Sequence, residues 1–141
     1  MKKTLRWVSL ILVCLSFLTM TAFAQETIVP LSSSYIKGSS AGITYKNTGD
    51  LEIYFWVSGK SVMSEIGATS IELYEVNGDS SSLIKTYRYT DYGYSHLMGA
   101  NKGVHTASVT YSGTKGQQYY AKVYLTVGNS SGSDSIIEIA Q

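Results

Sequence analysis

The chain has 141 residues, a formal net charge of +1 at pH 7 and only 15% charged residues. A chain of this length holds one domain, and its near-neutral balance gives no electrostatic basis for binding nucleic acid. It contains one proline, thirteen glycines and twelve tyrosines, whereas a helix bundle is rich in Leu, Ala, Glu and Lys. The composition therefore argues against a helical fold.

Residues 1–24 have the layout of a secretory signal peptide. Met1 to Arg6 is a short positively charged start, and an apolar stretch follows from Trp7 to Met20. A transmembrane helix needs about 20 predominantly apolar residues, and this stretch is shorter and contains Ser and Thr. The pattern therefore favours a signal peptide over a membrane anchor.

Small residues mark the expected cleavage site. Ala22 and Ala24 occupy the two positions that signal peptidase reads, which predicts cleavage between Ala24 and Gln25. The remaining chain would have eight basic and ten acidic residues and no further membrane-spanning stretch. It would also lack cysteine, because Cys14 lies within the signal. Disulfides, thiolate metal sites and a cysteine nucleophile are thereby excluded for the secreted form.

The secreted form is expected to consist of an arm and one domain. Residues 25–40 are rich in Ser and Gly, and we expect them to form a flexible N-terminal arm. Residues 41–141 show period-2 alternation of apolar and polar side chains, which predicts antiparallel strands. This alternation is clearest in residues 51–57, 104–111 and 117–127.

Strand parity also predicts the core. Apolar residues that share the inner parity of their strands should meet between two sheets, and we expect this of Phe55, Val109, Val123 and Leu125. The same reasoning applied to the last strand predicts that Ile137 and Ile139 face inward.

Two segments rich in turn-forming residues divide the strands. Asn77–Asp79 predicts a tight turn into a return strand over residues 83–89. Gly113–Gly116 predicts a hairpin turn.

The number and spacing of these strands predict an all-β fold. About seven antiparallel strands suit an immunoglobulin-like or fibronectin-III-like β-sandwich, with a jelly roll or small barrel as alternatives. Residues 116–123 resemble the penultimate strand of such domains, in which a tyrosine ties the strand to the preceding corner. The Cys-Trp-Cys pattern of antibody domains is absent from the sequence.

Three segments carry a resemblance to a family of small secreted proteins of Gram-positive bacteria. They are residues 66–73, 111–116 and 119–123. The resemblance extends over residues 60–135 and implies a secreted β-sandwich. It implies no catalytic residue, because that family has no established function.

The sequence predicts no catalytic centre. It has no Gly-x-Ser-x-Gly motif to position a nucleophilic serine, and its secreted part has only two histidines. His105 lies on the apolar side of its strand, as a core histidine would, and His96 lies in a loop. Glu72 and Glu75 fall on opposite faces of one strand, so they do not form the carboxylate pair of a glycosidase.

The sequence also predicts no metal site and no cofactor. Two isolated histidines do not provide a zinc site. Asp79, Asp91 and Asp134 lie in separate turns without the spacing of a calcium loop. Turns use such side chains to bind their own backbone.

Tyrosine placement is the strongest indication of a binding surface. Tyrosine offers a large contact area, few rotatable bonds and a hydroxyl group, so exposed rings can stack on sugars or contact a protein. The alternative is that these rings pair across strands and stabilise the sheet. The candidate ligand-binding residues are Tyr74, Tyr87, Tyr89, Tyr92, Tyr94, Tyr120 and Tyr124.

These observations predict a secreted, non-catalytic β-sandwich that acts as an extracellular interaction or surface-associated protein. Its expected partner is an unidentified extracellular protein or glycan. A carbohydrate-binding module that uses exposed tyrosines is the first alternative. A small secreted hydrolase is the second, and it would depend on His96 or His105.

Overall fold

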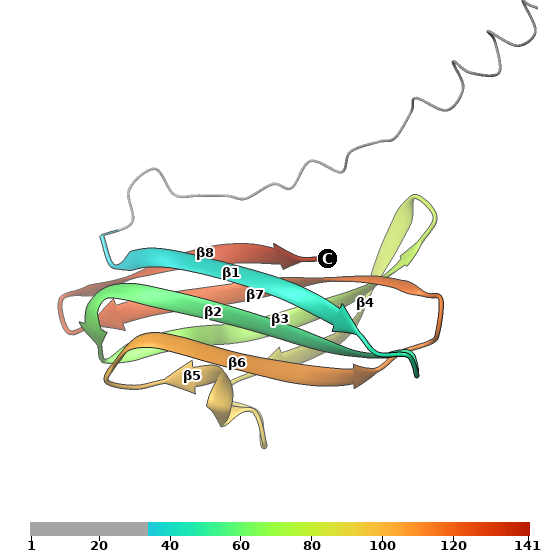
Figure 1. Cartoon of the computed structure of the whole chain (residues 1–141). Coiled ribbons are helices and arrows are strands. Elements are labelled where there is room, and N and C mark those ends of the chain that lie inside the picture. Colours follow the sequence, from blue (N-terminus) through green and yellow to red (C-terminus); the bar gives the residue numbers. More distant parts are fainter. Residues whose placement is uncertain (1–33) are drawn as a thin grey trace, which may run out of the picture.

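A computed structural model describes residues 34–141, which form two antiparallel β-sheets packed face to face (Figure 1). The expected signal peptide, its cleavage site and residues 25–33 of the expected arm lie outside the described residues. The elements are β1 (Ile36–Tyr45), β2 (Asp50–Met63), β3 (Glu65–Asn77), β4 (Ser80–Arg88), the 3₁₀-helix η1 (Ser95–Leu97), β5 (Met98–Gly99), β6 (Lys102–Ser112), β7 (Gln118–Asn129) and β8 (Gly132–Ala140).

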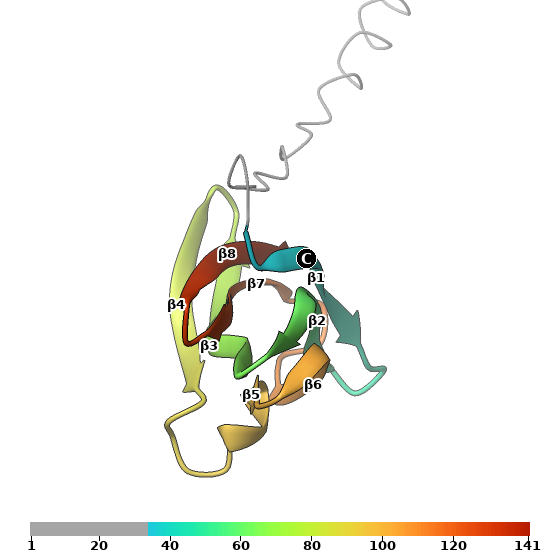
Figure 2. The ribbon, with the colours of Figure 1, turned by 90° about the vertical axis from the view of Figure 1, so that its left-hand side faces the viewer.

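The strands divide into a three-stranded and a five-stranded sheet. Sheet A has the order β1-β2-β6, and sheet B has the order β4-β3-β7-β8 with the short β5 beside β3. All the strand pairs are antiparallel. Figure 2 shows the two layers from the end of the strands. The predicted all-β fold with antiparallel sheets is confirmed.

The core lies between the sheets and is built from the predicted strand parity. Phe55 and Val109 come from sheet A, whereas Val123 and Leu125 come from sheet B, and all four are buried in one cluster. Successive side chains of a strand point to opposite faces, so the central strands β2 and β7 contribute every second residue over residues 51–57 and 119–127 to this cluster. The prediction of a shared core is confirmed.

The first strand, β1, begins within residues 25–40, which were expected to form a flexible arm. β1 pairs with β2 from Ile36 onward, so residues 36–40 belong to sheet A. The Gly and Ser residues of this segment are typical of a flexible arm. Its backbone nevertheless completes the edge of the sheet, because β2 offers a full row of hydrogen-bonding groups.

The segment Gly113–Gly116 does not form the predicted hairpin turn. It connects β6 of sheet A to β7 of sheet B, so the flanking strands are not paired with each other. The predicted tyrosine tie is present at this corner. The hydroxyl of Tyr119 accepts a hydrogen bond from the backbone N–H of Thr114 at 2.9 Å.

The expected orientation of Ile137 and Ile139 is wrong. β8 pairs with β7 so that Ile136 lies opposite Leu125 and Glu138 lies opposite Val123, which directs Ile136 and Glu138 inward. Isoleucine occurs at both parities of this strand, so alternation alone could not choose. The short connection between β7 and β8 sets the register instead. Glu138 is buried, and its carboxylate accepts a hydrogen bond from the hydroxyl of Ser39 on β1 at 2.5 Å.

Candidate functional site

The structure separates the seven candidate tyrosines into three groups. Tyr74, Tyr120 and Tyr124 lie together on the outer face of sheet B. Tyr87 and Tyr94 pack against each other, and Tyr87 is buried in the core. Tyr89 and Tyr92 are exposed beside or within the loop that follows β4. Only the first group forms a cluster.

The first group, together with Glu72 and Lys122, is called the tyrosine cluster. The register of β3 and β7 places Tyr74 opposite Tyr120 and Glu72 opposite Lys122. The rings of Tyr74 and Tyr120 stack in parallel, with centroids 4.8 Å apart and planes inclined by 2°. The prediction that these tyrosines share one outer face is confirmed.

One carboxylate organises the cluster. The hydroxyls of Tyr74 and Tyr124 both donate hydrogen bonds to Oε2 of Glu72, at 2.7 and 3.0 Å. The hydrogen bond to Glu72 and burial raise the pKa of Tyr74 to about 12. Burial and the same carboxylate raise the pKa of Tyr124. Both phenols therefore stay neutral donors well above neutral pH, and their positions are fixed by a charge-assisted bond.

The stacked rings stand on edge rather than lying flat. The distance between the two ring centroids matches the distance of about 4.8 Å between neighbouring strands. Rings that stand upright on neighbouring strands, with their faces toward each other, have this spacing. One face of each ring is covered by the other ring. The ammonium nitrogen of Lys122 also lies 5.2 Å from the centroid of Tyr74, within the range of a cation–π contact.

Apolar side chains extend the cluster on both sides. Leu83 on β4 lies opposite Tyr74 and is 51% exposed. On β8, Ile137 lies opposite Tyr124, and Ile139 lies opposite Lys122. The corrected orientation of β8 therefore adds two isoleucines to the outer face of sheet B. The resulting surface is apolar at its edges and polar at Glu72.

Tyr87 does not lie on the surface, as a residue that binds a ligand through an exposed ring would. It is only 2% exposed, and its hydroxyl donates to the carbonyl of Thr110 in the opposite sheet at 3.1 Å. Burial raises the pKa of its phenol to about 12. Tyr94 packs edge-on against it, with ring centroids 5.1 Å apart, and is only partly exposed. This pair closes the core beneath the loop.

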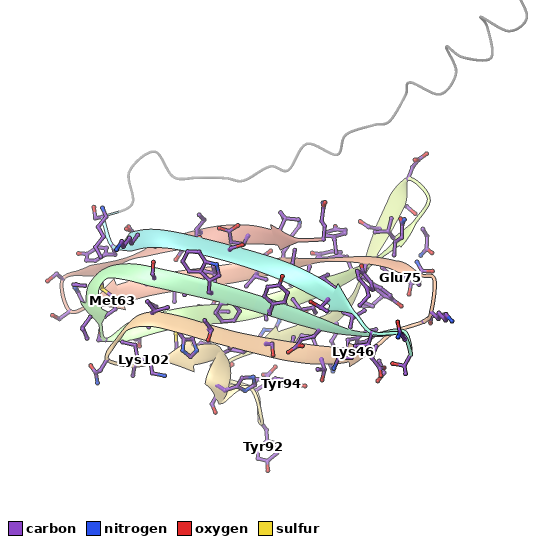
Figure 3. All side chains as sticks on the ribbon, in the orientation of Figure 1. Lys46, Met63, Glu75, Tyr92, Tyr94 and Lys102 are labelled. Carbon is purple, nitrogen blue, oxygen red and sulfur yellow. The ribbon has the colours of Figure 1, made fainter. Side chains whose placement is uncertain are left out.

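The loop after β4 presents two of the predicted tyrosines to solvent. Tyr89 is 38% exposed and Tyr92 is fully exposed. Figure 3 shows Tyr92 at the tip of the loop, pointing away from both sheets, and Tyr94 nearer the body of the protein. A ring at such a position can contact a partner. Its full exposure shows that no side chain of the described residues packs against it to form a larger surface.

Both histidines have structural roles. His105 is buried, and its Nε2 lies 2.9 Å from the carbonyl oxygen of His96. The Nε2 of His96 in turn lies 3.0 Å from the carbonyl oxygen of Ser108. These bonds attach η1 to β6, which confirms the interpretation of His105 as a core residue. Both imidazoles thus bind backbone carbonyls, where a hydrolase would need one beside a hydroxyl nucleophile.

The aromatic side chains of β2 were not among the predicted site residues. Tyr54 and Trp56 point outward from sheet A and are 45% and 40% exposed. The alternation that identified Phe55 as a core residue also places its two neighbours on the opposite face. That signal was present in the sequence, but only the tyrosines of other strands were assigned to a binding surface.

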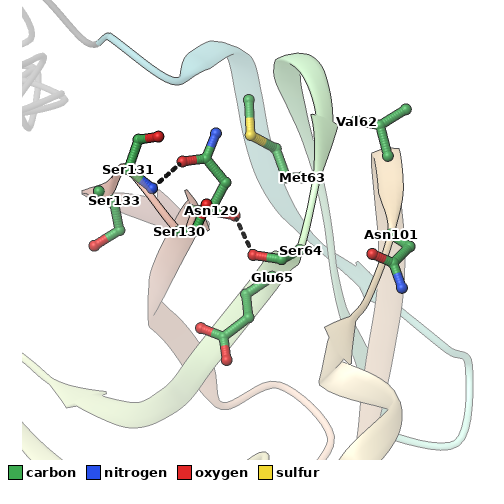
Figure 4. A pocket seen from close by; sticks show the side chains of 11 residues that line it. Val62, Met63, Ser64, Glu65, Asn101, Asn129, Ser130, Ser131 and Ser133 are labelled. Atoms are coloured by element: carbon green, nitrogen blue, oxygen red, sulfur yellow. Dashed lines mark hydrogen bonds between the residues drawn. The ribbon is translucent and has the colours of Figure 1, made fainter.

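An open depression of about 800 Å³ lies at one end of the sheets (Figure 4). Val62 and Asn101 line one side of it, and the connection between β7 and β8 lines the other. The hydroxyl of Ser64 donates to the carbonyl of Gly128, and the side chain of Asn129 accepts from the N–H of Ser131. These polar groups therefore serve the local backbone.

Comparisons of the chain with models of protein families, with curated proteins and with solved structures find no match. Within residues 34–141, no group of three or more His, Cys, Asp or Glu side chains could hold a metal ion. The same part of the chain has no helix with the length and apolar character needed to cross a membrane. The outer faces of the two sheets carry the outward-facing aromatic side chains described above and are the candidate binding surfaces.

Proposed function

We propose that this protein is a secreted, non-catalytic binding module with a fibronectin-III-like sandwich. It contacts an extracellular protein through the outer face of sheet B. The proposal rests on one observation: Tyr74 and Tyr124 both bind Glu72, and Tyr120 stacks on Tyr74 beside them. The signal-like N-terminus and the resemblance to small secreted proteins of Gram-positive bacteria support the extracellular location.

Strand order supports the fibronectin-III-like assignment. If the seven long strands are lettered A, B, C, C′, E, F and G in chain order, sheet A reads A-B-E and sheet B reads C′-C-F-G. Immunoglobulin-like sandwiches group A, B and E in one sheet and C, F and G in the other. Tyr119 near the start of strand F supplies the corner contact that these folds use.

The tyrosine cluster has the properties of a protein-binding surface. Tyrosine is enriched in the residues that dominate binding energy at interfaces, and these residues lie at the centre of the contact. Glu72 and the ring stack hold the three phenols in place, so little side-chain entropy remains to be lost on binding. Leu83, Ile137 and Ile139 add apolar area around this centre.

A carbohydrate-binding role for the same face has less support. Stacking on a sugar requires an accessible aromatic face, whereas Tyr74 and Tyr120 cover a face of each other. The two rings turn their edges to solvent instead. Edges and hydroxyls suit contact with a protein surface, which offers apolar side chains and hydrogen-bonding groups together.

Site-specific photocrosslinking tests the proposal. A benzophenone amino acid at position 83, next to Tyr74, should give a discrete crosslinked product with another secreted protein when the full chain is expressed in its native host. The combined Tyr120→Ala and Tyr124→Ala substitutions should abolish that product. The same probe at Val104, which is exposed on sheet A, is the matched control. An identical product from position 104, or a product that survives the tyrosine substitutions, would contradict the proposal.

A further inference from the structure

Sheet A carries a second aromatic surface, formed by Tyr54 and Trp56. They lie two residues apart on β2, the central strand of the sheet, so both side chains point outward and their Cα atoms are about 7 Å apart. We call them the aromatic pair. It lies on the opposite side of the sandwich from the tyrosine cluster.

The two rings lean over β1 because that strand carries glycine beneath them. A Cβ atom added to Gly42 would lie 2.5 Å from the hydroxyl oxygen and 2.6 Å from Cζ of Tyr54. A Cβ atom added to Gly38 would lie 3.1 Å from the six-membered ring of Trp56. Neither glycine has a positive φ, so backbone conformation does not require glycine at these positions. Its role here is to make room for the rings.

This packing leaves each ring with one side toward the backbone and the other toward water. The exposed fractions of 45% and 40% agree with one open side. The tyrosine cluster differs in this respect, since its stacked rings cover one another. The aromatic pair therefore offers the accessible aromatic faces that the tyrosine cluster lacks.

Small hydroxylated residues surround the aromatic pair. The register places Ser40 and Thr106 on either side of Trp56, and Ser108 beside Tyr54. Glu52 precedes Tyr54 by two residues on β2 and therefore lies on the same face. It accepts a hydrogen bond from the hydroxyl of Ser108 at 2.7 Å. A carboxylate has room for about four such bonds. Further hydroxyl donors can therefore bind Glu52.

The charge of this surface restricts its ligand. The three rows of residues across sheet A that include Glu52, Tyr54 and Trp56 contain one carboxylate and no lysine or arginine. Phosphate- or carboxylate-bearing polymers would meet repulsion here without a compensating cation. A neutral ligand with flat apolar faces and many hydroxyl groups complements the surface.

We propose that the aromatic pair binds a neutral, extended polysaccharide of β-1,4-linked pyranoses. Sugars with equatorial substituents present only axial C–H groups on their faces, and these groups pack against the electron-rich face of an aromatic ring. The chain runs along β2, so that successive sugars meet Tyr54 and Trp56. Glu52 and the neighbouring hydroxyls bind the equatorial hydroxyl groups at the edges of the sugars.

Aromatic rings that lean over glycine also stabilise a sheet without any ligand. A stabilising role and a binding role make different predictions for Gly42→Ala. This substitution keeps both aromatic residues and suits strand geometry, but its methyl group displaces the ring of Tyr54 from β1. A binding site should lose affinity when that ring moves, whereas the fold should be retained.

Fluorescence titration with cellohexaose and chitohexaose provides the test. Trp7 and Trp56 are the two tryptophans of the chain, so the full chain with Trp7→Phe reports on Trp56 alone. Binding should shift the emission of Trp56, and calorimetry should give the affinity. Trp56→Ala should weaken binding by about tenfold or more, as truncation of an interface tryptophan does. Gly42→Ala should weaken it less, and Tyr120→Ala on the opposite face should leave it unchanged.

Circular dichroism confirms that each variant is folded before it is titrated. Preference for both neutral oligosaccharides over an oligogalacturonate of equal length supports the proposal. Three results would overturn it: no binding of either neutral hexamer by the reference chain, binding that persists in Trp56→Ala, or equal loss in Tyr120→Ala. The crosslinking result on sheet B does not affect this outcome.

Discussion

The hydroxyl of Tyr119 accepts a hydrogen bond from the N–H of Thr114, 2.9 Å away across the corner between β6 and β7. The backbone carbonyl of Tyr119 accepts a second bond from the hydroxyl of Tyr45, at the end of β1. Its ring also packs edge-on against Tyr111, with centroids 5.9 Å apart. One residue thus connects both sheets where the chain passes from one to the other.

Tyr119→Phe should lower the free energy of unfolding by about 1–3 kcal/mol, because the N–H of Thr114 loses the phenol oxygen that accepts its hydrogen bond in a partly buried corner. Urea denaturation monitored by circular dichroism measures the change. Tyr111→Phe, which keeps the edge-on ring contact, is the matched control and should cost less. Equal effects of the two substitutions would show that the corner bond contributes little.

Leu125→Ala should cost about 2–5 kcal/mol, because Leu125 is only 1% exposed and its truncation leaves a cavity between the sheets. Thr126→Ser, at the next position on the outer face of β7, keeps the hydroxyl that donates to the carbonyl of Asp134. It is the control and should change stability by no more than about 0.5 kcal/mol. Chemical denaturation of both variants provides the comparison. A small effect at position 125 would contradict the register of β7.

The core could be predicted because its strands alternate cleanly. Phe55, Val109 and Leu125 have polar or exposed residues at both neighbouring positions, so only one parity can face inward. β8 lacks this property, since isoleucine occupies consecutive positions. Its orientation depends on the short connection to β7 and on a partner for Glu138, and Ser39 on β1 provides that partner. Neither contact can be read from local pattern.

The binding surfaces could be predicted only in part. Parity places Tyr74, Tyr120 and Tyr124 on one face. The stacking of Tyr74 on Tyr120, and the bonds of Tyr74 and Tyr124 to Glu72, require the register between β3 and β7. Tyr87 belongs to a tyrosine-rich segment whose composition suggests a binding surface. Its pairing with Ile71 directs it into the core instead. The aromatic pair depends on Gly38 and Gly42, whose importance appears only once β1 lies beside β2.

A double-mutant cycle on Tyr74 and Tyr120 should give a coupling energy of about 0.5–1.5 kcal/mol, since stacked aromatic pairs contribute that much beyond the area they bury. The cycle uses the two single Leu substitutions and the double substitution, with thermal and chemical denaturation as measurements. Tyr74 and Tyr54, which lie on opposite sheets, form the control pair and should show additive effects. Additivity between Tyr74 and Tyr120 would argue against a stabilising stack.

Processing of the N-terminus should produce a chain that begins at Gln25, because Ala22 and Ala24 occupy the positions that signal peptidase reads. N-terminal sequencing of the protein recovered from culture medium measures this directly. Ala24→Leu should block cleavage and leave the uncleaved chain with the cells. A secreted form that retains Trp7 would disprove the prediction.

Stability should fall between pH 10 and 12, in part because of Tyr74. The hydrogen bond to Glu72 raises the pKa of this phenol to about 12 in the folded chain, whereas an unfolded tyrosine ionises near 10. The folded state therefore holds a proton that the unfolded state loses, and linkage makes unfolding easier as pH rises through this window. Below pH 10 the contribution of Tyr74 is fully present.

Tyr74→Phe should reduce the loss of stability between pH 10 and 12, because a phenylalanine has no proton to lose. Glu72→Gln should have a related effect, since it removes the carboxylate that holds the phenol neutral. Glu75→Gln on the same strand removes a carboxylate that binds Asn77 rather than a tyrosine, and its pH dependence should match that of the unsubstituted chain. Urea midpoints measured across this pH range test all three variants. If Tyr74→Phe and Glu75→Gln gave identical curves, the shared bond to Glu72 would have no role in alkaline unfolding.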